Sequence, residues 1–265
     1  MVPADAPFDV LTALTSLGDG RFAADLPDGW QQGRGLFGGI VTAVLVRALE
    51  ASAPDRALRS LTSELCGPTQ PGPAELRVEV LRVGSAVSTL AVRLIQGGEV
   101  QAHGVGVLGR ARARDLDGTR VSGPALSDWR SMDRLPMQAP LAPTFTQYFD
   151  FRSTRFPFSG GESVTEGWIR PSNPGGLRDA AFLAACIDAW WPALFQIETR
   201  PRPMATIAFT FQPQGDFDGL DPEAPLFHCG TLVANRDGYA VEFRELWGHD
   251  GRLMATNQQT IAVIA

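Results

Sequence analysis

A single carboxylate, Asp188, lies in an otherwise apolar stretch of the chain and is the residue best suited to chemistry. Counting back from it by three or four residues gives Ala184, Ala181 and Leu177, which is the spacing of the apolar stripe of a helix. A buried carboxylate without partners costs several kcal/mol, so Asp188 is expected to have partners or a catalytic role. The alternative to a catalytic role is a structural group that accepts hydrogen bonds from loop N–H groups.

The position of Asp188 near the end of its helix predicts a raised pKa. Pro192 follows shortly and marks the C-terminal end of the helix. The helix macrodipole disfavours a negative charge there, and burial in apolar surroundings acts in the same direction. A carboxyl group with a raised pKa would be a more effective base at neutral pH.

The sequence shows no pattern typical of a metal site, a nucleophilic serine or a phosphate-binding loop. The histidines, His103, His228 and His249, are scattered and have no metal-ligand spacing. The sequence also lacks a Gly-x-Ser-x-Gly nucleophile elbow and the common glycine-rich phosphate loops. We therefore expect neither a metal nor a cofactor.

The composition is that of a globular protein without nucleic-acid or membrane partners. Of the 265 residues, 44% are hydrophobic, which provides a core for one large domain or two of ordinary size. The net charge of −6 argues against nucleic acid as a partner. We see no signal peptide and no apolar run of membrane length, so no membrane insertion is expected. Three widely separated cysteines, Cys66, Cys186 and Cys229, favour buried thiols in a reducing cytoplasm.

The elements that must position Asp188 occur twice along the chain. The first copy contains Asp28-Gly29-Trp30, then Gly38-Gly39 and an apolar helix from residue 40 to about 51, stopped by Pro54. The second copy contains Glu166-Gly167-Trp168, then Gly175-Gly176 and the helix of Asp188. Each copy is therefore expected to place one long helix on a sheet, which buries both apolar faces.

Four strand-like runs follow each helix. In the first copy they span residues 60–65, 74–83, 87–96 and 100–109, and in the second 205–212, 227–235, 240–248 and 253–264. The turns Gly97-Gly98 and Asp250-Gly251 are strong hairpin signals. Strict alternation along 205–212 puts Thr206 and Thr210 on one face of their strand.

The stretch between the copies is rich in Arg, Asp, Gly, Ser and Pro and predicts a linker over the surface. The sequence thus predicts an N-terminal module at 1–112, a linker at 113–145 and a C-terminal module at 146–265.

Taken in order, these features resemble the acyl-CoA thioesterase II (TesB-like) double-hotdog family. The resemblance covers roughly residues 22–265 and rests on Gly35-Leu36-Phe37-Gly38-Gly39, the Asp188 helix, Ala205-Thr206-Ile207 and Ala255-Thr256-Asn257-Gln258-Gln259. It implies an α+β double hotdog, in which two fused modules each wrap an antiparallel sheet on one long central helix. It also implies an acyl-CoA substrate and a homodimer of double hotdogs.

The resemblance further implies a water-activating triad of Asp188, Thr206 and Gln259 in the C-terminal module. Two alternatives stay open from the sequence. Thr210, on the face expected for Thr206, could supply the hydroxyl group, whereas Gln258 and Gln259 face opposite sides of their strand, so that only one can reach the site.

Substrate-binding residues are expected beside this triad. Backbone N–H groups at Gly38-Gly39 or Gly175-Gly176 are suited to bind the oxyanion. The acyl chain needs apolar walls, for which the sequence offers Trp190, Trp191, Phe195, Phe209 and Phe211. The phosphates of CoA would meet arginines from the set Arg152, Arg155, Arg170 and Arg178.

The first copy lacks the residues of this site. Aligning the copies puts Glu50 or Ala51 opposite Asp188, Ser60 opposite Thr206 and Gly106 opposite Gln259. We therefore expect one working site per chain, with the first copy as a structural partner that also walls the acyl pocket.

Three functions fit these expectations. The first is hydrolysis of a fatty acyl-CoA to free acid and CoA. The second is non-catalytic binding of acyl-CoA on the same fold. The third is a hotdog enoyl-CoA hydratase or dehydratase, which would need a histidine brought beside Asp188 by folding.

Overall fold

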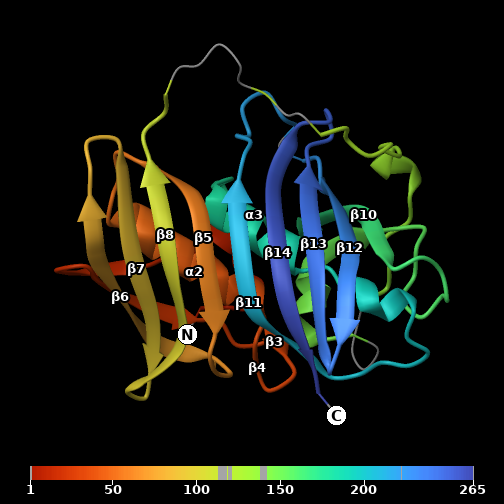
Figure 1. Ribbon diagram of the computed structural model, residues 1–265, viewed down its shortest axis with the longest axis horizontal. Coiled ribbons are helices and arrows are strands. Elements are labelled where there is room, and N and C mark those ends of the chain that lie inside the picture. Colours follow the sequence, from red (N-terminus) through yellow and green to blue (C-terminus); the bar gives the residue numbers. More distant parts are fainter. Residues whose placement is uncertain (1, 113–117, 119–120, 138–141, 222, 265) are drawn as a thin grey trace.

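One antiparallel sheet of twelve strands crosses the whole molecule (Figure 1). The computed structural model describes residues 2–112, 118, 121–137, 142–221 and 223–264. The strand order is β1-β2-β6-β7-β8-β5-β11-β14-β13-β12-β10-β9. The strands are β1 (Thr15–Gly18), β2 (Arg21–Leu26), β5 (Ala57–Leu65), β6 (Gly72–Val83), β7 (Val87–Gln96), β8 (Glu99–Gly109), β9 (Phe149–Arg152), β10 (Val164–Pro171), β11 (Met204–Pro213), β12 (Leu226–Arg236), β13 (Tyr239–Trp247) and β14 (Leu253–Val263). A separate two-stranded ribbon consists of β3 (Gln31–Gln32) and β4 (Gly35–Leu36).

The strand order repeats itself in mirror fashion about the centre of the sheet. Six strands on one side, ending in β5, correspond in order to six strands on the other, ending in β11. The two halves meet where β5 and β11 pair, with Ser63 opposite Phe209. The sheet is therefore a double hotdog, in which backbone hydrogen bonds join the two halves. The linker boundaries stay a prediction, and residues 113–117 lie outside the described part.

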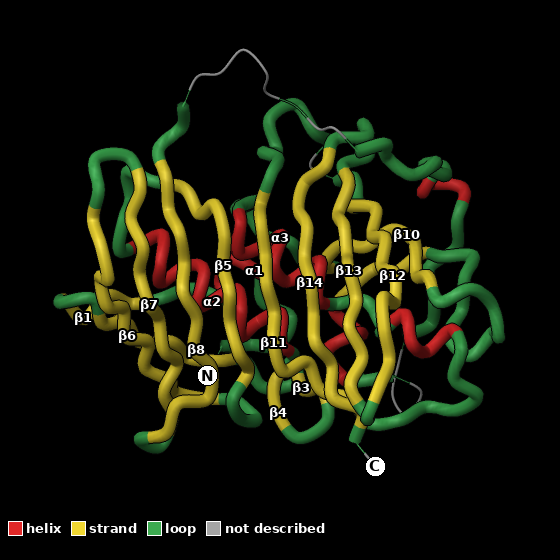
Figure 2. Tube along the Cα trace, in the orientation of Figure 1, coloured by secondary structure: helices red, strands yellow, loops and turns green. Residues whose placement is uncertain are grey.

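Two helices lie side by side against the inner face of this sheet (Figure 2). They are α2 (Gly38–Ala51) and α3 (Ala180–Asp188), and a short α1 (Phe8–Leu11) precedes the sheet. The side chain of Asp179 caps α3 by accepting a hydrogen bond from the Phe182 N–H at 3.0 Å. Leu177 consequently lies before the helix and is 51% exposed, so its predicted place on the apolar stripe is wrong. No helix among the described residues is long and apolar enough to span a membrane.

All eight predicted strand runs are present, and each ends within three residues of its predicted bounds. The strands β1, β2, β9 and β10 were not predicted, and they lie at the two edges of the sheet. Two predicted matches between the copies are wrong. Glu166-Gly167-Trp168 lies within β10, whereas Asp28-Gly29-Trp30 follows β2, and Gly175-Gly176 precedes the helix cap rather than opening α3.

A β-bulge in β11 changes which residues share a face. Thr206 pairs with Ile261 and Ala208 with Thr260, so Ile207 is an extra residue without a partner on β14. Because of it, Thr206 lies on the inner face together with Phe209, which is opposite Gln259. Thr210 lies on the outer face, opposite Gln258. The predicted common face of Thr206 and Thr210 is therefore wrong.

The segment between the two halves packs against the C-terminal half of the sheet. Its residues Leu126, Trp129 and Met132 cover a cluster of Trp168, Phe227 and Trp247. Farther along, Phe145, in the 3-10 helix η2 (Thr144–Tyr148), stacks on Phe37 with ring centroids 4.1 Å apart. The chain between the modules thus covers the core next to Phe37, the residue that precedes α2.

Candidate active site

A chain of hydrogen bonds joins the three residues of the predicted triad. The Gln259 Nε2 group donates to Asp188 Oδ1 at 2.8 Å, and Thr206 Oγ1 lies 2.9 Å from Gln259 Oε1, to which its hydroxyl donates. Each residue comes from a different element: α3, β14 and β11. The amide orientation of Gln259 is fixed from both sides, because Thr206 donates to its oxygen and Asp188 accepts from its nitrogen. The structure therefore brings the three predicted residues together, and the bulge at Ile207 is what puts Thr206 within reach.

The carboxylate of Asp188 also meets the N-terminus of α2, which belongs to the other half of the sheet. The backbone N–H of Gly39 donates a hydrogen bond to it. A Cβ atom at Gly38 would lie 2.8 Å from Asp188 Oδ2, so only glycine lets the carboxylate lie this close. The positive end of the α2 dipole therefore faces the anion. The sequence predicts only the unfavourable dipole of the helix that carries Asp188, and the structure adds a favourable one.

Burial raises the pKa of Asp188, as predicted. The cation of Arg244 and the hydrogen bonds from Gln259 and the Gly39 N–H oppose this effect, and they are weaker than the loss of solvation. Asp188 is only partly buried, in contrast to Gln259, which is 1% exposed. A carboxyl group with a raised pKa is suited to accept a proton from water near neutral pH.

Two buried charged residues, Glu242 and Arg244, lie behind this site and were not predicted. Their exposed fractions are 0% and 2%, and Arg244 Nη2 lies 2.9 Å from Glu242 Oε2. They occupy alternate positions of β13, on either side of the outward-facing Phe243, which is 52% exposed. Alternation along β13 would by itself predict that the apolar Val241 and Phe243 face the core and that Glu242 and Arg244 face solvent. The opposite arrangement could be predicted only by knowing that β13 packs against the end of α3.

The aromatic residues predicted to wall the acyl site are buried to different extents and lie in different surroundings. Trp190 and Trp191 are 2% and 8% exposed and follow Asp188 two and three residues along the chain. The indole ring of Trp190 stacks on His228 with centroids 5.0 Å apart. Phe209 and Phe211 lie on the inner face of β11, opposite Gln259 and Asn257. Phe195 instead packs against Phe158, with centroids 5.0 Å apart.

Two predicted binding groups lie elsewhere. Thr210 is on the outer face of the sheet, where its hydroxyl lies 3.4 Å from the Gln258 carbonyl oxygen, so it cannot replace Thr206. The N–H of Gly176 donates to Asp9 Oδ2 at 2.8 Å, and that of Leu177 to the same oxygen at 3.2 Å. The Gly175-Gly176 turn therefore binds a carboxylate of this chain and does not face the triad.

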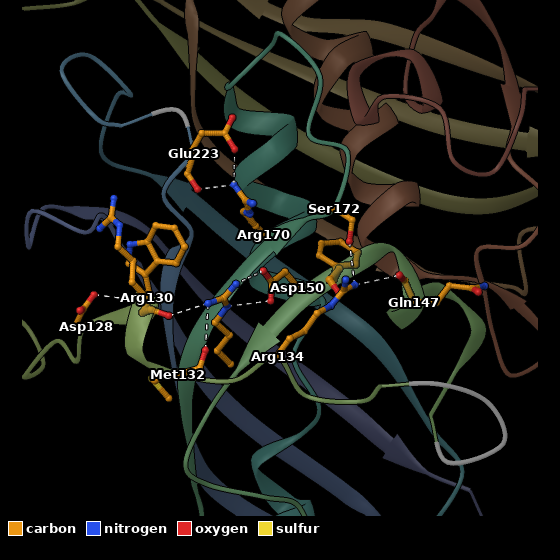
Figure 3. A network of polar contacts seen from close by, with 12 residues as sticks. Asp128, Arg130, Met132, Arg134, Gln147, Asp150, Arg170, Ser172 and Glu223 are labelled. Atoms are coloured by element: carbon orange, nitrogen blue, oxygen red, sulfur yellow. Dashed lines mark hydrogen bonds and ion pairs between the residues drawn. The ribbon is translucent and has the colours of Figure 1, made fainter.

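The arginines suggested for the CoA phosphates are held within the chain. Arg152 pairs with Asp150 at 2.8 Å and Arg155 with Glu166 at 2.7 Å. Arg170 pairs with Glu223 at 3.0 Å, and Arg178 Nη1 donates to the carbonyl oxygen of Gly175 at 2.8 Å. The network around Asp150 and Arg170 lies along β9 and β10 (Figure 3). These guanidinium groups are part of the scaffold.

Among the residues that the structure describes, the corresponding end of the helix pair in the first copy has no such triad. There Arg47 and Asp179 form an ion pair of 2.8 Å, and Glu50 accepts a hydrogen bond from the Leu58 N–H at 3.1 Å. Gly106, aligned with Gln259, has no side chain to contribute. Among the described residues, no group of three or more His, Cys, Asp or Glu side chains could hold a metal ion.

Comparison with known families identifies the family of the chain. Residues 26–109 match the family model of the acyl-CoA thioesterase N-terminal domain, and residues 123–263 match that of the acyl-CoA thioesterase C-terminal domain. The chain belongs to the acyl-CoA thioesterase family. This thioesterase is thus a thioester hydrolase, and its substrate class is acyl-CoA. The family assignment argues against the alternative of a binding protein without activity.

The thioesterase also resembles solved structures along nearly its whole length. One is a conserved protein of unknown function with a hot dog fold from Alicyclobacillus acidocaldarius, at 26% identity and a TM-score of 0.85, covering 97% of this chain and 98% of the other. Another is the acyl-CoA thioesterase II TesB2 from Mycobacterium marinum, at 17% identity and a TM-score of 0.77, covering 97% and 98%. A third is a tesB protein from Mycobacterium avium subs paratuberculosis, at 16% identity and a TM-score of 0.79, covering 98% and 100%. A search of curated proteins finds no significant match.

Proposed function

We propose that this thioesterase hydrolyses fatty acyl-CoA to free acid and CoA, with Asp188 as general base for the attacking water. The observation that carries the proposal is the continuous chain from Thr206 through Gln259 to Asp188, with bonds of 2.9 and 2.8 Å. Thr206 fixes the orientation of the Gln259 amide, and the amide fixes the orientation of the Asp188 carboxylate. A water molecule bound to this carboxylate would therefore be in position before the reaction begins.

The reaction needs no covalent intermediate. The water oxygen attacks the thioester carbonyl carbon while Asp188 takes the proton of the water. The tetrahedral intermediate collapses with breakage of the C–S bond, and the thiolate of CoA leaves. The proton on Asp188 then passes to the thiolate or to solvent, which restores the base. We expect the oxyanion to lie over the N-terminus of α2 at Gly38-Gly39, where the helix dipole favours negative charge.

The apolar groups beside Asp188 suit the acyl chain. Trp190 and Trp191 lie two and three residues after the base in sequence, and Phe209 is opposite Gln259 in the strand pair. We propose that these rings form the wall of the acyl site.

A hydratase or dehydratase is the less favoured reaction. That chemistry would pair Asp188 with a histidine that also faces the substrate. Among the described residues, the polar groups that affect the carboxylate come from Gln259, Gly39 and Arg244. His228 is fully buried and lies flat against Trp190, so it does not face an open site.

The test replaces Asp188 by asparagine and uses Glu50→Gln as its matched control. Both residues are carboxylates with burial-raised pKa values at the end of a helix. Thiol release from a panel of acyl-CoAs is expected to fall about 10³-fold in kcat for Asp188→Asn and to stay near wild type for Glu50→Gln. Equal activity of the two variants would refute the role of Asp188.

We also propose one working site per chain, a cytoplasmic location and a homodimer. The three cysteines are free, which suits a reducing compartment, but only Cys186 is buried, so the prediction of buried thiols is wrong for the exposed Cys66. Large apolar side chains on β12 and β13, Val233, Tyr239 and Phe243, are 52%, 53% and 52% exposed and could be covered by association. Light scattering should give twice the chain mass of 28.5 kDa, and a single-chain mass would exclude the dimer.

A further inference from the structure

The buried ion pair of Glu242 and Arg244 contacts the end of the helix that carries Asp188. A buried ion pair contributes little to stability compared with apolar residues of the same size. Its presence at the end of the catalytic helix is therefore better explained by what it holds in place.

Arg244 closes the C-terminal end of α3. Its Nη1 group donates to the main-chain carbonyl oxygens of Ile187, Asp188 and Trp190 at 3.2, 3.3 and 3.3 Å. The last carbonyl groups of a helix have no partner within it, and here one guanidinium group supplies the partner. The helix has only nine residues, and Asp188 is its last one. The guanidinium therefore fixes the backbone from which the catalytic carboxylate extends.

Glu242 fixes Arg244 in turn. Its Oε2 atom accepts from Arg244 Nε and Nη2 at 3.1 and 2.9 Å, and its Oε1 atom accepts from the Leu194 N–H at 3.3 Å. Glu242 also lies directly opposite Gln259 in the pairing of β13 with β14. The pair of strands β13 and β14 thus carries both the Gln259 amide, which binds Asp188, and the Glu242 carboxylate, which holds Arg244 against the end of α3.

We propose that Glu242 and Arg244 are positioning residues of the thioesterase site, which hold the end of α3 so that Asp188 meets Gln259 and the Gly39 N–H. The proposal rests on the proposed role of Asp188 as base. Neither residue touches the reacting atoms, because both are enclosed behind the helix end.

The charge of Arg244 gives a second, separable effect on Asp188. Its cation lowers the pKa of the Asp188 carboxyl group, against the larger effect of burial. The other groups that act on this carboxyl group are the Gln259 amide from β14 and the Gly39 N–H from α2. On β12, burial and Arg244 hold the pKa of His228 well below its usual value, so that this ring is neutral. Loss of the cation should therefore raise the pKa of Asp188 and move the acid limb of the kcat/KM profile to higher pH.

The test is the double variant Glu242→Gln/Arg244→Met, which removes both charges at once and leaves none buried alone. The chain offers a matched control in Asp150→Asn/Arg152→Met. That pair has the same i, i+2 spacing on β9, and Arg152 Nη1 likewise donates to main-chain carbonyl oxygens, those of Trp129 and Met132 at 2.9 and 3.1 Å. Each variant is assayed with the acyl-CoA on which the wild type is fastest, after its melting temperature has been measured.

For the Glu242→Gln/Arg244→Met variant we expect kcat to fall about 100-fold with KM nearly unchanged, since a small misplacement of a catalytic group has this effect. The control variant should keep both its kcat and its KM. A kcat equal to that of the control would overturn the proposal.

Single variants keep the test decisive if the double variant does not fold. Arg244→Lys retains the cation but has fewer donors for the three carbonyl groups. It should lower kcat about 10-fold with the acid limb unmoved, while Arg152→Lys should lower it less than twofold. Equal kcat values for these two variants would also overturn the proposal. Asp188→Asn in the same assay separates the two claims, because activity in that variant would refute the general base itself.

Discussion

At the scale of single residues, the site depends on one hydroxyl group, one amide and one carboxylate in a fixed order of donors and acceptors. Thr206 donates to Gln259, and Gln259 donates to Asp188. Because Thr206 donates to the amide oxygen, the amide nitrogen must donate to Asp188. The Asp188 carboxylate is therefore an acceptor, and it can also accept a hydrogen bond from a water molecule. A change in any one group should therefore affect the other two.

Thr206→Val tests this order, because valine keeps the shape of threonine and lacks only the donor. The Gln259 amide loses the bond that fixes its orientation, and kcat should fall about 10-fold. Thr210→Val is the matched control from the same strand, and it should leave kcat unchanged because Thr210 is on the outer face. Steady-state thiol release measures both. A larger effect from Thr210→Val would contradict the assigned face of each residue.

The raised pKa of Asp188 also makes stability depend on pH. A carboxyl group with a higher pKa in the folded state binds its proton more tightly there than in the unfolded chain. Its contribution to stability is fully present below the unfolded pKa and is lost as pH rises through the folded pKa. The wild type should therefore lose stability relative to Asp188→Asn as pH rises.

Urea unfolding of both proteins between about pH 4 and pH 8 measures this difference. Glu50, whose pKa is also raised by burial, contributes equally to both proteins and cancels. A wild type that gains stability relative to Asp188→Asn with rising pH would show that the pKa is lowered instead.

At the scale of elements, the site forms where the end of one helix meets the start of another. The C-terminal residue of α3 lies against the N-terminus of α2, and the glycine at position 38 permits the contact. The anion receives a hydrogen bond from Gly39 and the favourable end of the α2 dipole, which partly offsets its burial.

Gly38→Ala should disturb this contact. Its new Cβ atom would lie 2.8 Å from Asp188 Oδ2, a distance that forces the carboxylate to move. We expect a loss of about 1–3 kcal/mol in the free energy of unfolding and a fall in kcat. Gly176→Ala is the control, because its Cβ atom would lie 3.7 Å from Asp9 and needs no movement. Denaturant unfolding and steady-state kinetics of the two variants test this prediction. Similar losses of stability and kcat in both variants would contradict the close contact between Gly38 and Asp188.

At the scale of the whole molecule, the site belongs to both halves. Asp188, Thr206 and Gln259 come from the C-terminal half, yet Gly39 binds Asp188 from the N-terminal half. The halves share the β5–β11 pairing and the α2–α3 contact. The C-terminal half by itself would expose the edge of β11 and one side of α3.

Separate expression of residues 121–265 should therefore give a fragment without thioesterase activity. Co-expression with residues 1–112 should give two chains that purify together on one affinity tag and release thiol from acyl-CoA. The uncut chain serves as the reference for activity. Hydrolysis by the C-terminal fragment alone would show that the first half is dispensable for chemistry.

Much of the fold follows from local pattern. The eight central strands, their hairpin turns and the two helices α2 and α3 were predictable because each is encoded by a periodicity or a turn signal within a few residues. The four edge strands β1, β2, β9 and β10 were missed. Strands β1 and β9 have only four residues each and carry little periodicity, whereas β2 and β10 have six and eight, so length does not account for them.

The sequence by itself determined that Asp188 lies on a buried helix, that Gln259 lies on the last strand and that the carboxyl pKa is raised. Only the tertiary structure decided which hydroxyl group faces the site, because the extra residue Ile207 reverses the alternation that local pattern assumes. It alone also decided that Glu242 and Arg244 lie inside while Phe243 lies outside. Burial is set by what packs against a strand from elsewhere in the chain, and no local period contains that information.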